Sequence, residues 1–133
     1  MSAAVTYKPK GHSDISIYMM AEDAQAVIDF AVDVFGAEEL MKMERPDGTI
    51  MHAEFRIGDS VVMLSQGTKE YKAFPVWLHV YVPNLDATYK KAVARGAESV
   101  MEPVKRDDPD DHDRRGGVKD PAGNTWWIAT SDD

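Results

Sequence analysis

The chain contains one pattern of segments twice, and this duplication is the strongest constraint on its fold. In each copy, an apolar strand-like segment leads through Asp-Ala into a helix-like stretch that ends at Gly-Ala-Glu, at residues 36–38 and again at 96–98. Short strand patterns follow, and a tight turn interrupts them at 46–48 in the first copy and 120–123 in the second. Repetition of a whole supersecondary unit predicts two similar modules packed together. A cleft between such modules is a natural place for a small ligand.

The composition limits the partners that this chain can have. Its 133 residues suit one compact domain, and 15 Lys and Arg against 23 Asp and Glu give a net charge of −8, which disfavours nucleic acid and anionic membranes. The absence of cysteine excludes disulfides, thiolate zinc sites and a cysteine nucleophile. The first residues lack the features of a secretory signal, and no apolar run is long enough to cross a bilayer. We therefore expect a soluble, cytoplasmic protein.

Hydrophobic periodicity and turn residues predict an α+β chain with the order strand, helix, strand, strand, strand, occurring twice. Asp23 is suited to cap the first helix and Gly36 to end it. We expect a loose arm at 1–13 and a single domain at 14–133, divided into module one at about 14–65, a linker at 66–75 and module two at about 76–131. The predicted strands are 14–20, 39–45, 49–57 and 60–65, then 76–82, 99–104, 115–119 and 125–130, and the second helix is predicted at about 86–95.

Alternation of side chains along two predicted strands separates an apolar face from a mixed one. In strand 76–82, the aliphatic residues Leu78, Val80 and Val82 suit contact with a helix, and Trp77, His79 and Tyr81 lie opposite. In strand 49–57, the predicted apolar face holds Met51, Ala53, Phe55 and Ile57, with Ile50, His52, Glu54 and Arg56 opposite. The mixed faces suit a concave wall that contacts a ligand, and an exposed sheet face is the alternative.

Several short motifs, in this order, resemble one known superfamily. They are Ile28-Asp29-Phe30, the run from Val34 to Leu40, Pro46-Asp47-Gly48, His52-Ala53-Glu54, the run from Ile57 to Ser60, and the ending from Arg114 through Val118 to Trp126. The superfamily is that of the vicinal oxygen chelate proteins, which includes glyoxalase I, bleomycin-resistance proteins and extradiol dioxygenases. The chain looks most like the bacterial glyoxalase-like branch labelled 3-demethylubiquinone methyltransferase-like, over residues 13–131. The resemblance implies two βαβββ modules whose curled, mixed sheets enclose one cavity.

The resemblance also implies where a metal would bind. Metal-dependent members of the superfamily carry a ligand on the first and fourth strands of each module, and these positions fall at Ser16, Met63, Trp77 and Trp127. A hydroxyl, a thioether and two indoles are not the nitrogen and oxygen ligands that divalent cations need. We therefore expect no metal and no cofactor, and we disfavour glyoxalase-type isomerisation and extradiol cleavage, which depend on the metal.

The main functional expectation is a metal-free, homodimeric protein that binds a small molecule, as the bleomycin-resistance proteins do. Aromatic walls bind planar or cationic ligands well. The candidate ligand-binding residues are Tyr18, Met63, Trp77, Tyr81, Trp127 and Arg114. In the alternative interpretation, the two tryptophans fill the cavity and nothing binds.

An enzyme of the same superfamily is the second functional hypothesis. His52, Glu54 and His79 are the catalytic candidates, for a lyase, isomerase or dioxygenase with or without a divalent metal, because an imidazole beside a carboxylate suits a base and its orienting group. A polar pair on an exposed sheet face is the alternative for these residues.

Two further segments carry charge near the predicted cavity. Residues 107–113 hold five carboxylates but lack the order of an EF-hand calcium loop, so we expect a solvated, mobile loop over the cavity mouth. Arg114 suits an anionic ligand, Glu54 or a loop-anchoring salt bridge. Residues 120–123 are typical of a tight turn.

Overall fold

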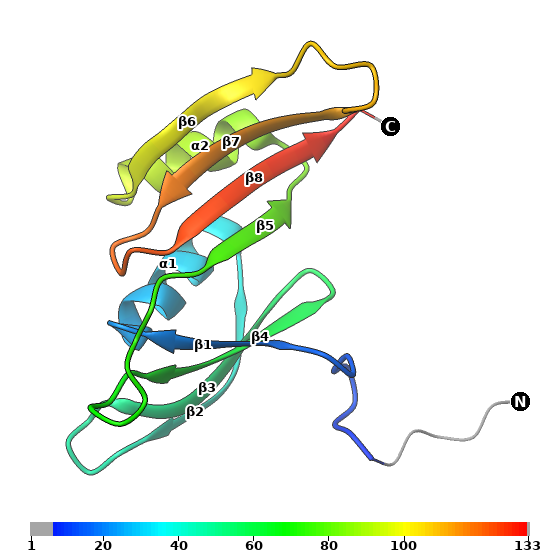
Figure 1. The fold of residues 1–133 in the computed structure, drawn as a ribbon. Helices are drawn as coiled ribbons and strands as arrows, with labels where there is room; N and C mark the ends of the chain where they lie inside the picture. The colour runs from blue at the N-terminus through cyan, green and yellow to red at the C-terminus, as the bar shows by residue number, and fades with distance from the viewer. Residues whose placement is uncertain (1–6, 133) are drawn as a thin grey trace, which may run out of the picture.

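The computed structural model describes residues 7–132, which form two four-stranded mixed sheets and two helices (Figure 1). Residues 1–6 of the predicted arm lie outside the described residues. Module one contains β1 (Ile17–Ala21), α1 (Ala24–Phe35), β2 (Glu38–Glu44), β3 (Ile50–Ile57) and β4 (Ser60–Gln66). Module two contains β5 (Trp77–Tyr81), α2 (Leu85–Ala94), β6 (Glu98–Lys105), β7 (Asp113–Lys119) and β8 (Thr125–Ser131). The predicted α+β class and the doubled βαβββ order are confirmed.

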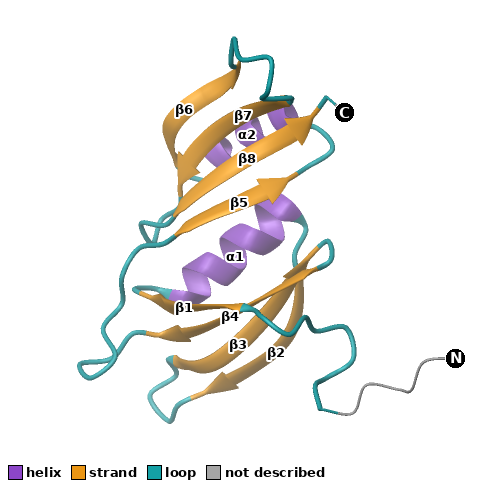
Figure 2. Ribbon diagram, turned by 45° about the vertical axis from the view of Figure 1, so that its right-hand side comes forward, coloured by secondary structure: helices purple, strands orange, loops and turns teal. Residues whose placement is uncertain are grey.

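The two sheets share one topology. Sheet A has the order β1-β4-β3-β2, and sheet B has the order β5-β8-β7-β6. In each sheet the first strand pairs in parallel with the fourth, and the other neighbours are antiparallel. The sheets curl without closing into a barrel, so each keeps one open face (Figure 2).

Helix α1 begins and ends at the residues predicted to cap it, Asp23 and Gly36. The Asp23 carboxylate accepts a hydrogen bond of 3.1 Å from the backbone N–H of Ala26, which satisfies one unpaired donor of the first turn. Gly36 adopts φ 68°, a left-handed conformation that glycine reaches without a steric penalty. Helix α2 uses Asn84 in place of an aspartate as its N-cap, and therefore begins at Leu85.

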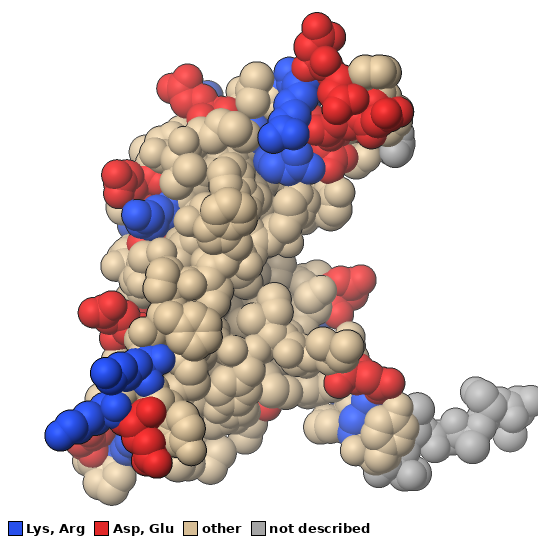
Figure 3. All heavy atoms as spheres, in the orientation of Figure 1, with Lys and Arg blue, Asp and Glu red and all other residues tan. Residues whose placement is uncertain are grey.

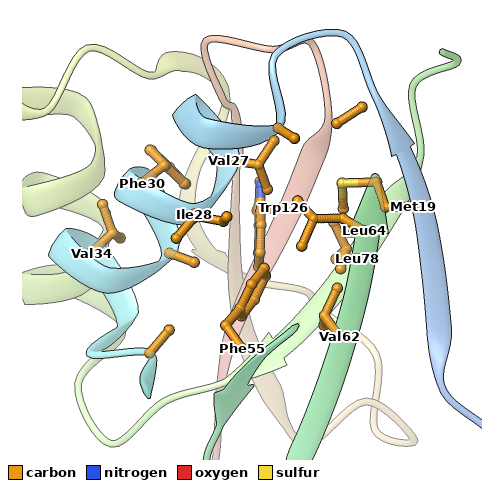
Figure 4. Close-up of a cluster of buried hydrophobic side chains, with 14 of the residues drawn as sticks. Met19, Val27, Ile28, Phe30, Val34, Phe55, Val62, Leu64, Leu78 and Trp126 are labelled. Carbon is orange, nitrogen blue, oxygen red and sulfur yellow. The ribbon is translucent and has the colours of Figure 1, made fainter. Parts of the chain in front are cut away.

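Helix α1 lies between the two sheets and joins the modules into one core (Figure 2). Its Phe35 stacks on Trp126 of β8 with ring centroids 4.9 Å apart, and Phe30 lies 5.9 Å from the same indole. Phe55 and Leu78 contribute to the cluster from sheets A and B respectively (Figure 4). The modules therefore cannot separate without exposing Trp126, the largest fully buried side chain within residues 7–132.

The prediction of which side chains form the apolar face of β3 is wrong for the first two residues of the strand, Ile50 and Met51. Met43 of β2 pairs with His52 and Glu44 pairs with Ile50, so Met51 has no partner and forms a β-bulge. The bulge reverses the alternation, which buries Ile50 and leaves Met51 exposed. Beyond the bulge the predicted order holds, with Ala53 and Phe55 fully buried.

Among the described residues, neither helix is long and apolar enough to span a membrane.

Candidate ligand-binding site

The open face of sheet B carries three aromatic side chains at alternate positions of β5 and β8. Trp77 and Trp127 meet edge to face, with ring centroids 5.3 Å apart. Tyr81 lies on the same face of β5, two residues beyond His79. The ring centroids of His79 and Tyr81 are 4.9 Å apart. Trp77 is 74% exposed. Such exposure is unusual for an indole, because its large apolar surface is unfavourable in water. In Figure 1, α2 lies behind sheet B and this face is turned towards the viewer.

A glycine beneath Trp127 determines the position of its ring. A Cβ added at Gly117 of β7 would lie 2.6 Å from Cζ3 of Trp127, closer than real Cβ contacts. The indole therefore lies flat against the β7 backbone, in space that only glycine leaves open. The Trp127 indole N–H is buried and has no hydrogen-bond partner within residues 7–132.

Tyr81 lines a pocket that also contacts Ile17 and Val62 of sheet A, whereas Trp77, His79 and Trp127 border a neighbouring pocket of about 530 Å³. Met101 and Val104 of β6 complete its apolar wall, and Asp113 and Arg115 of β7 form its polar edge. All of its lining residues belong to module two. In Figure 3 charged side chains gather above this face, over the β6–β7 loop, and the middle of the face is largely uncharged.

The polar edge of the pocket is internally paired. Arg115 Nη2 donates to Asp113 Oδ2 at 2.9 Å, and Arg115 Nε donates to His79 Nε2 at 3.1 Å. Burial and the nearby Arg115 charge lower the pKa of His79, so His79 is neutral at pH 7 and its Nε2 acts as an acceptor. The hydrogen bond that Tyr81 donates to Asp113, at 2.8 Å, raises the pKa of Tyr81 and keeps its phenol protonated.

A second polar cluster lies on the open face of sheet A. Glu54 contacts two imidazoles, His52 Nε2 at 2.8 Å and His12 Nε2 at 2.7 Å. Tyr18 contacts His52 Nδ1 at 3.2 Å and Ser65 Oγ at 2.5 Å. Burial would raise the pKa of Glu54, but the two histidine hydrogen bonds outweigh it, and the pKa is lowered. Glu54 is therefore ionised although only 11% of its side chain is exposed.

The structure divides the predicted site residues between the two sheets. Tyr18 and Met63 are register partners on sheet A, and Trp77, Tyr81 and Trp127 are together on sheet B. His52 and Glu54 are in contact, but His79 belongs to sheet B, so one sheet does not carry all three catalytic candidates.

Arg114 lies away from both groups. It makes an ion pair with Asp86 of α2, with Nη1 2.8 Å from Oδ2, and does not line the pocket. This is the salt bridge that the sequence left as one option, although its partner is on a helix. The neighbouring Arg115 has the pocket position and was missed. Gly117 pairs with Trp127, and the residue two positions earlier in β7 lies on the same face. This alternation would have identified Arg115.

His12 was also missed, because Pro9 and Gly11 predicted a loose arm. Its imidazole is only 12% exposed and contacts Glu54, which lies far away in sequence. Nothing in the local pattern of the arm encodes that contact.

The metal positions implied by the superfamily do not fit a metal here. Met63, Trp77 and Trp127 lie in β4, β5 and β8, and Ser16 immediately precedes β1, so the set offers one hydroxyl, one thioether and two indoles. Within residues 7–132, no group of three or more His, Asp or Glu side chains is arranged to hold a metal ion. In the acidic segment, Asp111 and Asp113 instead form ion pairs with Arg115, at 3.5 and 2.9 Å.

The residue pattern and fold agree with a known family. A model of the Glyoxalase/Bleomycin resistance protein/Dioxygenase superfamily matches residues 15–128, and the chain belongs to this superfamily. An uncharacterized protein of Mycobacterium tuberculosis, Rv0887c, is 32% identical over 125 residues, which cover 86% of this chain and 72% of the relative.

Solved structures show the same fold. TioX from Micromonospora sp. ML1 is similar with a TM-score of 0.73 and 23% identity, over 90% of this chain and 98% of TioX. TnmS3, an antibiotic binding protein from Streptomyces sp. CB03234, has a TM-score of 0.67 and 18% identity, over 90% and 99% of the two chains. A PhnB protein from Bacillus cereus, described as a putative 3-demethylubiquinone-9 3-methyltransferase, has a TM-score of 0.66 and 16% identity, over 90% and 100%.

Proposed function

We propose that this protein is a metal-free small-molecule-binding protein that holds a planar ligand against Trp77 and Trp127. The observation that carries the proposal is the exposed, edge-to-face tryptophan pair beside a pocket of about 530 Å³. That volume lies within the range of roughly 300–1,000 Å³ typical of small-molecule sites. Gly117 fixes the Trp127 ring before any ligand arrives, which lowers the ordering cost of binding.

The lining residues indicate the chemistry of the ligand. A planar ring system would cover Trp77 and place its apolar surface against Met101 and Val104. Arg115 is already paired with Asp113, and Arg106 is a second cation that lines the pocket, so the polar edge offers hydrogen bonds and a positive charge. A ligand acceptor that reached the Trp127 indole N–H would satisfy a buried donor, whose unpaired state costs about 1–3 kcal/mol. The similarity of the fold to that of TnmS3, an antibiotic binding protein, supports this class of ligand.

We propose further that the protein is a homodimer, in which a second copy covers the open pocket. Only residues of module two line the pocket, whereas the candidates Tyr18 and Met63 lie on the open face of sheet A. Pairing sheet A of one copy with sheet B of another would bring the two groups together. The closed twofold symmetry common among homodimers would build two such sites. Light scattering at micromolar concentration should give twice the chain mass, and a monomer mass would refute the dimer.

The binding proposal is tested with the dye 1-anilinonaphthalene-8-sulfonate, which carries a planar naphthalene ring. We expect saturable fluorescence enhancement at one dye per chain. Trp77→Ala should weaken the affinity about tenfold, equivalent to about 1.4 kcal/mol. The matched control is Phe74→Ala, because Phe74 is another exposed aromatic residue (56%) that does not line this pocket. Equal affinity in the two variants would show that the dye does not use the tryptophan face.

The enzyme hypothesis retains support on sheet A alone. His79 is neutral and its Nε2 already accepts from Arg115, so it is not available as a base at that nitrogen. Tyr18, His52 and Glu54 form a connected polar cluster that is suited to proton transfer. Of the three catalytic candidates, His52 and Glu54 therefore carry the enzyme hypothesis.

A further inference from the structure

Strand β6 contains a bulge that brings one arginine to the pocket of sheet B. Met101 of β6 pairs with Gly117 of β7. The next register pair is Val104 with Arg115, so three steps along β6 correspond to two steps along β7. The extra residue reverses the alternation of side chains beyond it. Val104 and Arg106, which follows the end of β6, therefore share the pocket face with Met101, and all three line the pocket.

The neighbouring cations lie away from the pocket. Lys105, the last residue of β6, makes an ion pair with Asp132 at 3.2 Å. Its register partner Arg114 makes an ion pair with Asp86 at 2.8 Å. Neither Lys105 nor Arg114 lines the pocket. The bulge therefore decides that Arg106, and not Lys105, is the cation at this position of the wall.

The guanidinium of Arg106 has no hydrogen-bond or ion-pair partner within residues 7–132. The other arginines donate to side-chain oxygens, and they are Arg45, Arg56, Arg95, Arg114 and Arg115. The loop carboxylates that reach the polar edge of the pocket, Asp111 and Asp113, both pair with Arg115. The N–H donors of Arg106 are therefore available to a ligand.

The charges that line the pocket give a positive balance in a chain whose net charge is −8. Arg106 and Arg115 are cations, Asp113 is an anion, and His79 is neutral. The buried indole N–H of Trp127 is a further donor without an acceptor within residues 7–132. The apolar wall lowers the local dielectric, so charge acts more strongly here than in water. A cationic ligand would be repelled, and an anionic one would be attracted.

We propose that Arg106 selects the ligand by holding an anionic group, a carboxylate or a sulfonate, on a ring system that lies against Trp77 and Trp127. The planar guanidinium matches such oxyanions and can donate two parallel hydrogen bonds to one of them. This inference rests on the proposed binding function. The tryptophans supply the apolar contact, and Arg106 supplies the preference for an aromatic acid over an uncharged ring system of the same shape.

The proposed homodimer leaves this role to Arg106. In that arrangement, sheet A of a second copy covers the pocket. Glu54, a carboxylate on the open face of sheet A, already accepts hydrogen bonds from His12 and His52 of its own chain, at 2.7 and 2.8 Å. Arg106 therefore keeps its charge for the ligand when the pocket is covered.

Two dyes of similar shape separate the contribution of the charge from that of the rings. 1-Anilinonaphthalene-8-sulfonate and N-phenyl-1-naphthylamine share one ring system, and only the first carries a sulfonate. In Arg106→Gln we expect the affinity for the sulfonated dye to fall about tenfold, the scale of a hydrogen bond to a charged group. The affinity for the uncharged dye should not change. Fluorescence titration measures both affinities.

Two further variants serve as controls. Arg106→Lys keeps the charge and should retain most of the affinity for the sulfonated dye. Arg95→Gln removes a cation at the C-terminal end of α2, which lies behind sheet B, and should leave both affinities unchanged. Added salt should weaken binding of the sulfonated dye more in the wild type than in Arg106→Gln, because salt screens the charge.

The two proposals fail in different ways. Equal affinity for the sulfonated dye in the wild type and Arg106→Gln, or an equal loss for both dyes, would overturn the anion site and leave the binding function standing. Trp77→Ala should weaken both dyes, and if neither depended on Trp77 the binding function itself would fail. In light scattering, Arg106→Gln should keep the wild-type mass. A halved mass would assign Arg106 to the contact between copies and overturn its role in the ligand site.

Discussion

Trp126 and Trp127 are neighbours in β8 with opposite surroundings. Trp126 is fully buried and stacked on Phe35 of α1, whereas Trp127 lies on the open face against Trp77. Neighbouring residues of a strand point to opposite faces, so one strand supplies both the centre of the core and the wall of the pocket. Trp126 belongs to module two but lies beneath a helix of module one.

This arrangement predicts unequal costs for two adjacent substitutions. Trp126→Phe removes the indole N–H that donates to the buried Asp120 carboxylate at 2.8 Å, and should lower the free energy of unfolding by about 2–3 kcal/mol. Trp127→Phe should cost less than about 1.5 kcal/mol, the scale of a tolerated apolar replacement. Urea denaturation measures both values, and the reverse ranking would contradict the assigned faces of β8.

Gly117 should be essential to the pocket. In Gly117→Ala, the new methyl group displaces the Trp127 ring, which should weaken binding of 1-anilinonaphthalene-8-sulfonate about tenfold and destabilise the fold by about 1–3 kcal/mol. Gly116→Ala is the matched control, because its nearest contacts are 3.3–3.4 Å away, at Met101 and Pro103. The control should retain the dye affinity, and unchanged affinity in both variants would show that Trp127 is not a pocket wall.

The fold could be predicted from sequence because local signals specified it. Asp23 and Gly36 mark the ends of a helix whatever surrounds them, and the duplication fixed the order of the strands. The errors arose where pairing between distant segments decides the outcome. The bulge at Met51 depends on the register with β2, and the burial of His12 depends on Glu54.

The candidate site was predictable only in part, for the same reason. Alternation placed Trp77 and Tyr81 on one face, but it could not show that His79 lies on a different sheet from His52. The choice between Arg114 and Arg115 required the register of β7 on β8. That register is a property of the assembled sheet.

Purified protein should contain no stoichiometric transition metal, because Ser16, Met63, Trp77 and Trp127 occupy the ligand positions of the superfamily. Elemental analysis of protein prepared without chelators provides the test. About one nickel, zinc, iron or manganese per chain would contradict the prediction and would direct attention to His52 and Glu54.

The lowered pKa of His79 makes the protein less stable in acid. The unfolded chain binds a proton at about pH 6.5, the ordinary value, and the folded chain binds it only at lower pH. The contribution of neutral His79 to stability is therefore fully present above pH 6.5. It is lost as the pH falls towards and through the pKa of His79 in the folded protein. His79→Gln should lose less stability between pH 7 and pH 5 than the wild type in thermal denaturation, with both compared at pH 8. An identical pH dependence would refute this role for His79.

The most direct test of the proposed function uses the indole N–H signals of the three tryptophans. A ¹H–¹⁵N NMR titration with 1-anilinonaphthalene-8-sulfonate, assigned with single Trp→Phe variants, reports each ring separately. We predict that the signals of Trp77 and Trp127 shift together and saturate at one dye per chain, whereas the signal of Trp126 stays in place. A shift confined to Trp126, or saturable binding that leaves Trp77 and Trp127 unperturbed, would contradict the assignment of the ligand site to the open face of sheet B.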